Sequence, residues 1–229
     1  MGSAVILEAS DGHVLDAYQA PSAGPQRGGV VIVQEIFGLN HHVRAVADEY
    51  ASLGFAVIAP ALFDRVRPGV DLGYTAEGTR EGRALRARIG WDAALLDLEA
   101  AARELRRTTG RAPAVIGYCW GGSLAWLMAC RSAEVACSIG YYGAQIIQFV
   151  GERPRVPVLL HFGEQDALIP AGDVEAIRRA HPEPDVEIFT YPADHGFNCS
   201  DRPAHDPGSA ALALGRSLEL LHGPRDASI

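Results

Sequence analysis

A cysteine in a glycine-rich turn has the clearest capacity for covalent chemistry in this sequence. An apolar run leads into Gly117-Tyr-Cys119-Trp-Gly121-Gly and then into a segment expected to be helical. Glycines two positions either side of Cys119 suit a sharp strand-to-helix turn, because such a turn packs neighbouring backbone too closely for side chains. The turn would hold the thiol clear of a sheet, at a helix N-terminus whose dipole favours thiolate. The N–H of Trp120 would then face an oxyanion formed on an attacked carbonyl.

Two later segments supply the acid and the base that a cysteine nucleophile needs. Asp166 lies just past the predicted strand Val156–Phe162, and His195 follows the predicted strand Val186–Tyr191. A histidine beside a thiol can accept its proton, and a carboxylate behind that histidine stabilises the imidazolium. Asp194 is the alternative acid. Its side chain adjoins the histidine in sequence and would usually point elsewhere, which favours Asp166.

The elements that must position these residues form a strand–helix alternation. The nucleophile, acid and base follow one another in the order typical of the α/β-hydrolase fold. Short, continuously apolar runs predict strands buried on both faces. These runs are Val30–Val33, Phe55–Pro60, Ala114–Gly117, Val135–Ile139, Val156–Phe162 and Val186–Tyr191. Helices are expected at His42–Leu53, Trp91–Thr109, Gly121–Arg131, Ala171–Ala180 and Ser209–Leu221. The alternation predicts an α/β fold with a mainly parallel central sheet and helices on both faces.

The ends of this pattern differ from its centre. Ala4–Ala9 and His13–Tyr18 alternate apolar and polar residues around Asp11-Gly12, which predicts an N-terminal β-hairpin. The region 64–90 is rich in glycine and arginine, has no clear strand, and is expected to form an excursion over the sheet edge as a lid or substrate wall. In Trp91–Thr109 the helical period places Asp97 on the outer face. No internal repeat, charge block or low-complexity tract interrupts the sequence, so residues 1–229 are expected to form one domain.

Composition excludes several classes of function. A net charge of −8 opposes binding to nucleic acid, because that affinity comes largely from basic side chains at phosphates. The chain has no lysine, which excludes Schiff-base chemistry and a P-loop lysine. No G-x-G-x-x-G follows a strand, and His41-His42 has no partner at metal-ligand spacing, so we expect neither a cofactor nor a metal.

The expected location is the cytoplasm. The first ten residues have no basic segment followed by an apolar run, and no apolar stretch approaches the ~20 residues that span a bilayer. Because the sequence has no such apolar stretch, we expect no membrane partner. The four cysteines form no C-x-x-C pair, so free thiols are expected.

Several segments together resemble the dienelactone hydrolase family, the carboxymethylenebutenolidase-like α/β hydrolases. They are Val31–Asn40, Gly54–Phe63, the G-Y-C-W-G-G turn, Gly163–Asp166 and Asp194–Phe197. The resemblance implies a catalytic triad of Cys119, Asp166 and His195. It also implies that Glu35 lies against the resting thiol and helps it ionise, and that the N–H groups of Ile36 and Trp120 form the oxyanion hole.

The substrate-binding residues match the family less well. Family members that act on dienelactone bind its carboxylate with two arginines. Arg80 or Arg83 would supply the first, but the second position is Cys199, and the serine expected directly after the histidine is Gly196. Arg202 lies three positions beyond the expected second arginine. Because an arginine pair both binds and orients a carboxylate, the particular substrate stays open.

The sequence thus predicts an enzyme that cleaves a small ester or lactone through a thioester, as a monomer or homodimer. Phe37 and Tyr142 are further candidates for its substrate pocket. A glutamine-amidotransferase or glyoxalase-like enzyme is one alternative, although amidotransferase triads usually place a glutamate two residues after the histidine, where this chain has Phe197. A non-catalytic sensor of a small ligand is the other. The three candidate catalytic side chains argue against a sensor.

Overall fold

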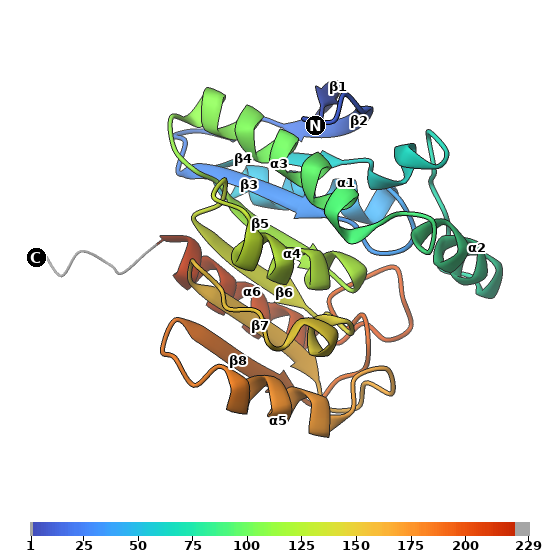
Figure 1. Cartoon of the computed structure of the whole chain (residues 1–229), viewed down its shortest axis with the longest axis vertical. Coiled ribbons are helices and arrows are strands. Elements are labelled where there is room, and N and C mark those ends of the chain that lie inside the picture. Colours follow the sequence, from blue (N-terminus) through green and yellow to red (C-terminus); the bar gives the residue numbers. More distant parts are fainter. Residues whose placement is uncertain (1, 223–229) are drawn as a thin grey trace, which may run out of the picture.

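The computed structural model describes residues 2–222 and contains one eight-stranded sheet (Figure 1). The strand order is β1-β2-β4-β3-β5-β6-β7-β8, in which β2 runs antiparallel to β1 and β4 while the other neighbours are parallel. The bounds are β1 Ser3–Glu8, β2 Val14–Ala20, β3 Gly28–Val33, β4 Phe55–Pro60, β5 Ala114–Tyr118, β6 Cys137–Tyr141, β7 Val158–Gly163 and β8 Val186–Tyr191. The predicted α/β fold, with its N-terminal hairpin, is confirmed.

Helices cover both faces of the sheet. In Figure 1, α3 (Trp91–Thr109), α4 (Trp120–Arg131) and α5 (Ala171–Ala180) lie in front of the sheet. The helices α1 (His41–Ser52) and α6 (Pro207–His222) lie behind it. All residues of β5, β6 and β7 are buried, as expected of parallel strands covered on two sides. The carboxyl ends of these strands therefore share one edge, where the turns that follow them can meet.

The region 64–90 contains regular structure that its composition did not predict. A short 3-10 helix, η1 (Leu62–Arg65), is followed by α2 (Ala76–Arg86), which extends from the carboxyl edge of the sheet in Figure 1. The Thr75 side chain caps α2 by accepting a hydrogen bond of 3.0 Å from the Gly78 N–H. Only three residues of the helix are buried, so its sequence has too few apolar residues at helical spacing to predict a helix.

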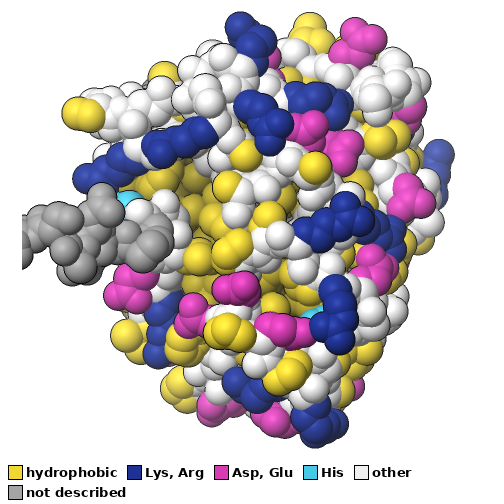
Figure 2. Space-filling model, turned by 60° about the vertical axis from the view of Figure 1, so that its left-hand side comes forward, with side chains coloured by type: hydrophobic (Ala, Val, Ile, Leu, Met, Phe, Trp, Pro, Cys, Tyr) yellow, Lys and Arg dark blue, Asp and Glu magenta, His cyan; other side chains and the backbone are white. Residues whose placement is uncertain are grey.

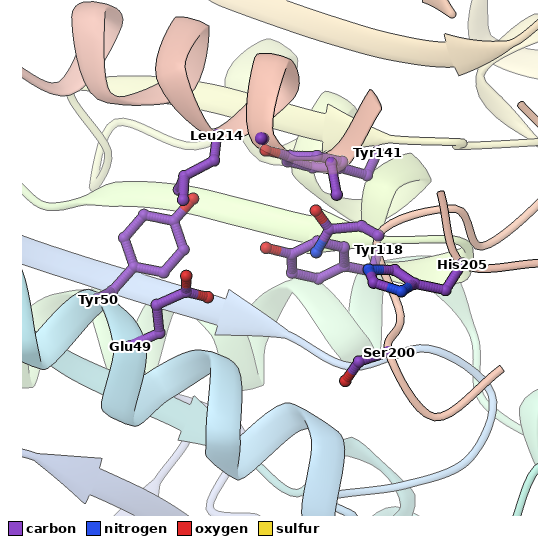
Figure 3. A pocket seen from close by; sticks show the side chains of 10 residues that line it. Glu49, Tyr50, Tyr118, Tyr141, Ser200, His205 and Leu214 are labelled. Atoms are coloured by element: carbon purple, nitrogen blue, oxygen red, sulfur yellow. The ribbon is translucent and has the colours of Figure 1, made fainter. Parts of the chain in front are cut away.

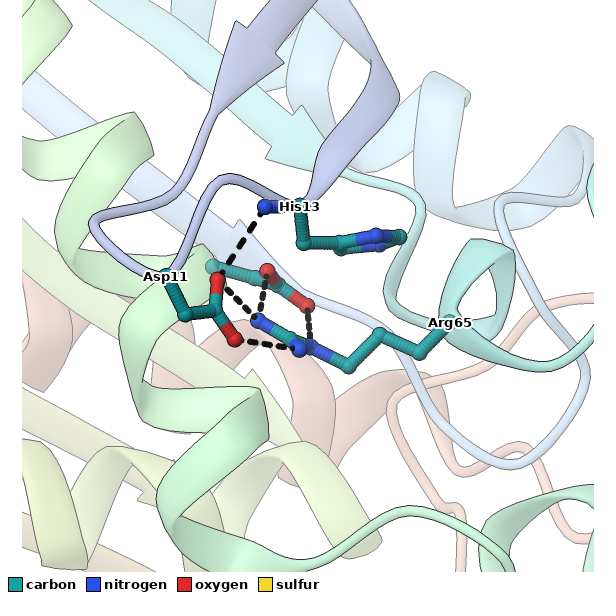
Figure 4. Close-up of polar contacts among 4 residues, drawn as sticks. Asp11, His13 and Arg65 are labelled. Atoms are coloured by element: carbon teal, nitrogen blue, oxygen red, sulfur yellow. Dashed lines mark hydrogen bonds and ion pairs between the residues drawn. The ribbon is translucent and has the colours of Figure 1, made fainter.

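The expectation that Asp97 faces outward is wrong. Its side chain is fully buried and accepts two hydrogen bonds of 2.7 Å from Arg65. The same guanidinium bonds Asp11 in the β1–β2 turn, so one arginine joins the hairpin, η1 and α3 (Figure 4). Burial raises the pKa of Asp97 while Arg65 opposes that rise. The apolar period of α3 could not reveal this site, because the arginine comes from a distant segment.

Charged side chains of both signs share the surface. On the side shown in Figure 2, arginines and acidic residues are interspersed around a hollow lined by hydrophobic side chains. Within residues 2–222, no helix has both the length and the apolar character needed to cross a bilayer.

Candidate active site

Cys119 lies in a strained turn between β5 and α4. Its backbone has φ 54° and ψ −115°, a combination that non-glycine residues rarely adopt, and its N–H donates to the Tyr141 carbonyl at 2.9 Å. A side chain at Gly117 would meet the Gly121 carbonyl, and one at Gly121 would meet the backbone carbonyl of Val33. The glycines thus permit the close backbone packing that holds the sulfur at the start of α4.

The Asp166 carboxylate is bonded to the His195 imidazole. Asp166 Oδ2 lies 2.7 Å from His195 Nδ1, and the other oxygen of Asp166 accepts the Leu168 N–H at 2.8 Å. Both side chains are buried. Asp194, the alternative acid, instead accepts the backbone N–H of His195 at 2.6 Å. The two aspartates therefore have separate roles, since one bonds the imidazole and the other the main chain.

The negative charges around His195 stabilise the imidazolium that forms when the ring accepts a proton. Burial disfavours the imidazolium, but the Cys119 sulfur and the Asp166 carboxylate outweigh that effect and raise the pKa of His195 to about 10. In the described part of the chain, Nε2 of His195 is buried and has no hydrogen-bond partner. This nitrogen is therefore available to a reacting group.

A cavity of about 530 Å³ connects these groups. Cys119 and His195 both line it, and so do Ile36 and Trp120. Among residues 2–222, the backbone N–H groups of Ile36 and Trp120 donate to no backbone carbonyl. The remaining lining residues are Phe37, Thr79, Arg83, Arg86, Ala144, Gln145, Gln148, Leu168 and Arg202.

Glu35 bonds an arginine in this structure, where the family resemblance implied a contact with the thiol. Its carboxylate is buried, and Oε1 accepts a hydrogen bond of 3.3 Å from Arg202 Nη1. Oε2 is buried without a partner among the described residues. Burial lowers the pKa of Arg202, but Glu35 and neighbouring tyrosine and cysteine side chains reverse this and raise it. The pair thus carries a fixed positive charge beside a buried negative one.

Gly196 makes room for this ion pair. Its φ of 84° lies in the left-handed region, and a Cβ added there would overlap the Arg202 guanidinium. The absence of a side chain directly after His195 therefore lets Arg202 cross this position and approach Glu35. Arg202 reaches the cavity from three positions beyond Cys199, the place where the family would have its second arginine.

The helix α2 brings two other arginines to the cavity. Arg83 and Arg86 line it, one helical turn apart, and the Arg86 guanidinium lies 4.7 Å from the centre of the Trp91 ring. Gly82 permits this arrangement, because a side chain there would overlap the Ile36 carbonyl. Arg80 lies elsewhere: its side chain is 76% exposed and pairs with Glu77. Of the two predicted alternatives, only Arg83 lines the cavity.

The two aromatic candidates have different positions. Phe37 lines the cavity and packs against Tyr74, with ring centres 4.5 Å apart. Tyr142 is fully buried, with its ring edge-on to the His195 imidazole at 5.0 Å, and it does not line the cavity. Its φ of 40° is, besides that of Cys119, a second unusual backbone conformation in this region. Tyr142 thus packs against the His195 ring outside the cavity, and Phe37 forms part of the cavity wall.

The prediction missed Arg86 and Leu168 as cavity residues. Arg86 lies three residues after Arg83, a spacing that would have indicated it had 76–86 been predicted as a helix. Leu168 is 53% exposed, which is unusual for a large apolar side chain, and it follows Asp166 by two residues. No sequence signal marks it, because a leucine after a strand is common in any fold.

The fold and the cavity define an α/β hydrolase, and comparison with known proteins gives its family. The dienelactone hydrolase family model matches residues 15–223, so the chain belongs to that family. It is 35% identical over 217 residues to a carboxymethylenebutenolidase homologue of Synechocystis sp., covering 88% of each chain. Identity to carboxymethylenebutenolidase 1 of Cupriavidus pinatubonensis is 34% over 207 residues, covering 87% of each.

A solved structure gives the same result. A dienelactone hydrolase homologue from Klebsiella pneumoniae superposes with a TM-score of 0.85 at 28% identity, covering 98% of this chain and all of that one. The predicted family is confirmed, and the protein is a hydrolase that acts on esters or lactones.

Proposed function

We propose that this hydrolase uses Cys119, His195 and Asp166 as a catalytic triad and forms a thioester with the acyl part of its substrate. The observation that carries the proposal is the 2.7 Å contact between Asp166 Oδ2 and His195 Nδ1, which leaves His195 Nε2 for a cavity that Cys119 also lines. A carboxylate on Nδ1 holds the tautomer whose Nε2 can accept a proton.

In the first half of the reaction, the Cys119 sulfur attacks the carbonyl carbon while its proton passes to His195 Nε2. The carbonyl π pair moves onto oxygen, and the N–H groups of Ile36 and Trp120 stabilise that oxyanion. Such donors contribute about 3–4 kcal/mol each in comparable sites. The pair then returns, the C–O bond breaks, and the leaving oxygen takes the proton from His195.

In the second half, water replaces the sulfur on the acyl group. His195 removes a proton from the water as its oxygen attacks the thioester carbonyl, and the same oxyanion site is used again. The C–S bond breaks, and the sulfur recovers the proton from the imidazolium. The products are a carboxylic acid and a free thiol, so the enzyme needs no further reactant.

Glu35 has a supporting part in this proposal. The family resemblance implies that this carboxylate helps the thiol ionise, and Oε2 is the oxygen without a partner among the described residues. Oε1 stays with Arg202. We therefore assign Oε2 as the atom that takes up the thiol proton when substrate enters and passes it on to His195 Nε2, so that the imidazolium can protonate the leaving oxygen.

The substrate we propose is a small ester or lactone that carries a carboxylate. Arg83, Arg86 and Arg202 line the cavity, and no acidic residue of the described chain does. A guanidinium can bind a carboxylate through two parallel hydrogen bonds, which fixes orientation as well as charge. The apolar walls at Phe37 and Leu168 suit the carbon skeleton.

Two measurements test the triad. Turnover of p-nitrophenyl acetate by the native protein and by Cys119→Ala should differ by at least about a thousandfold, because the nucleophile is lost. Mass spectrometry after rapid acid quench should detect an acyl adduct on Cys119. Turnover that persists in Cys119→Ala would refute the assignment. Absence of turnover in the native protein with every ester and lactone tried would instead favour the sensor.

A substrate screen tests the carboxylate. Lactones and short esters should be compared with analogues in which the carboxylate is a methyl ester or amide. Arg83→Met and Arg86→Met should each raise KM for the anionic substrate at least about tenfold, with little change for the neutral analogue, because loss of a charge-assisted bond costs about 1.5–3 kcal/mol. Arg80→Met is the matched control. Equal effects on both substrates would contradict the proposal.

A further inference from the structure

A second cavity, of about 370 Å³, lies on the opposite face of the sheet from α4. Its walls are α1, α6 and the segment 198–205, and its floor is Tyr118 and Tyr141 at the ends of β5 and β6. In Figure 3, Glu49 and Tyr50 extend from α1 toward this floor, and Leu214 approaches from α6. None of its lining residues lines the catalytic cavity.

The Tyr50 hydroxyl in this cavity is buried without a hydrogen-bond partner of suitable geometry among the described residues. Tyr50 as a whole is 1% exposed. Leaving such a hydroxyl unpaired is unfavourable, because water no longer solvates it. Burial raises the pKa of Tyr50, Tyr118 and Tyr141 well above the ordinary value, so all three hydroxyls stay neutral. They offer a ligand phenol oxygens and aromatic rings.

Besides the tyrosines, the ionisable side chains of the described chain that line this cavity are one carboxylate, Glu49, and one imidazole, His205. Glu49 lies at its rim, and among the described residues no ion pair involves its carboxylate. The surrounding protein desolvates that carboxylate and raises its pKa. A cation that paired with Glu49 would offset this desolvation. Within residues 2–222 no arginine lines this cavity, in contrast to the three arginines of the catalytic cavity.

From these observations we infer that the cavity between α1 and α6 is a binding site for a small organic ammonium ion. The ammonium group pairs with the Glu49 carboxylate and lies against the tyrosine rings, while the Tyr50 hydroxyl accepts an N–H. Aromatic rings combined with a carboxylate favour organic cations over neutral or anionic molecules. Ala210, Ala211 and Leu214 contact the hydrocarbon part of the ligand. This site is independent of the function proposed for the catalytic cavity.

The site also adjoins the catalytic machinery. Tyr118 directly precedes Cys119, and Tyr141 accepts the Cys119 N–H through its carbonyl. Asn198 and Ser200, which line the second cavity, belong to the same segment as His195 and Arg202. The two cavities thus use opposite sides of the same short stretches of chain.

Isothermal titration calorimetry with benzylammonium, using the full chain, tests the inference. We expect saturable binding with a Kd of about 1 mM or tighter, which is reasonable for a ligand of eight heavy atoms. Benzyl alcohol, the neutral analogue of similar shape, should bind at least about tenfold more weakly. Glu49→Gln should weaken benzylammonium binding by a similar factor. Glu187→Gln, which removes an exposed carboxylate on β8, is the matched control and should leave the Kd unchanged.

Three results would overturn the inference. These are absence of saturable binding up to about 10 mM, equal affinity for benzyl alcohol, and an unchanged Kd in Glu49→Gln. Tyr50→Phe adds an independent readout. It should weaken binding severalfold, because it removes the phenol oxygen that accepts the N–H of the ligand. Binding lost in Cys119→Ala but kept in Glu49→Gln would place the ligand in the catalytic cavity and would also refute the inference.

Discussion

Removing the Arg202 guanidinium should destabilise the fold more than removing either neighbouring arginine of the cavity. Arg202 Nη1 lies 3.3 Å from Glu35 Oε1, and the Glu35 side chain is 2% exposed. At an effective dielectric constant of about 20, two unit charges at this distance attract by about 5 kcal/mol. Arg202→Met abolishes this attraction and leaves the carboxylate buried and unpaired, a change that typically costs 3–5 kcal/mol. Because the Arg202 side chain is 22% exposed, we expect about 3 kcal/mol.

Urea unfolding of five proteins measures this value: the native chain, Arg202→Met, Glu35→Gln, the double variant and the Arg83→Met control. Glu35→Gln combined with Arg202→Met should recover most of the loss and lie within about 1.5 kcal/mol of the native protein, because no buried charge is then left without a partner. Arg83→Met is the matched control, since Arg83 lines the same cavity but pairs with no carboxylate in the described structure. The reasoning fails if Arg202→Met unfolds within about 0.5 kcal/mol of the native protein. It also fails if the double variant loses the sum of the two single effects.

Three shorter predictions concern the proposed catalytic groups and the helix over them. Asp166→Asn should lower kcat by about 10⁴ with little change in fold, because the amide selects the wrong His195 tautomer. A decrease in kcat of less than tenfold in a kinetic assay would refute the assignment of Asp166 as the acid of the triad. Cys119→Ala should lower the pKa of His195 in an NMR titration, since the sulfur raises it, and an unchanged pKa would contradict that cause. Gly82→Ala should displace α2 from Ile36 and so raise KM for anionic esters; an unchanged KM would show that the helix accommodates the methyl group without moving Arg83 and Arg86.

The sequence revealed those features that depend on short stretches of chain. The strands β3 to β7 are buried along nearly their whole length because both faces are covered, and the turn at Cys119 is marked by glycines that its geometry requires. The helix α2 was not predicted, because it buries only a narrow face and its sequence therefore has few apolar residues. Asp97 and Arg65 could not be paired from sequence, since an ion pair between distant segments leaves no local pattern.

Arg202 shows how several departures from a family pattern can form one structural change. Considered separately, Cys199 in place of an arginine and Gly196 in place of a serine suggest a weakened substrate site. In the structure, the guanidinium of Arg202 occupies the space that a Cβ at Gly196 would fill, and so it reaches Glu35 and the cavity. The cavity therefore keeps an arginine close to His195 in the chain, although a different position supplies it. It follows that restoring serine at Gly196 alone should harm the protein, because the new side chain would displace the guanidinium while Cys199 offers no charge to replace it.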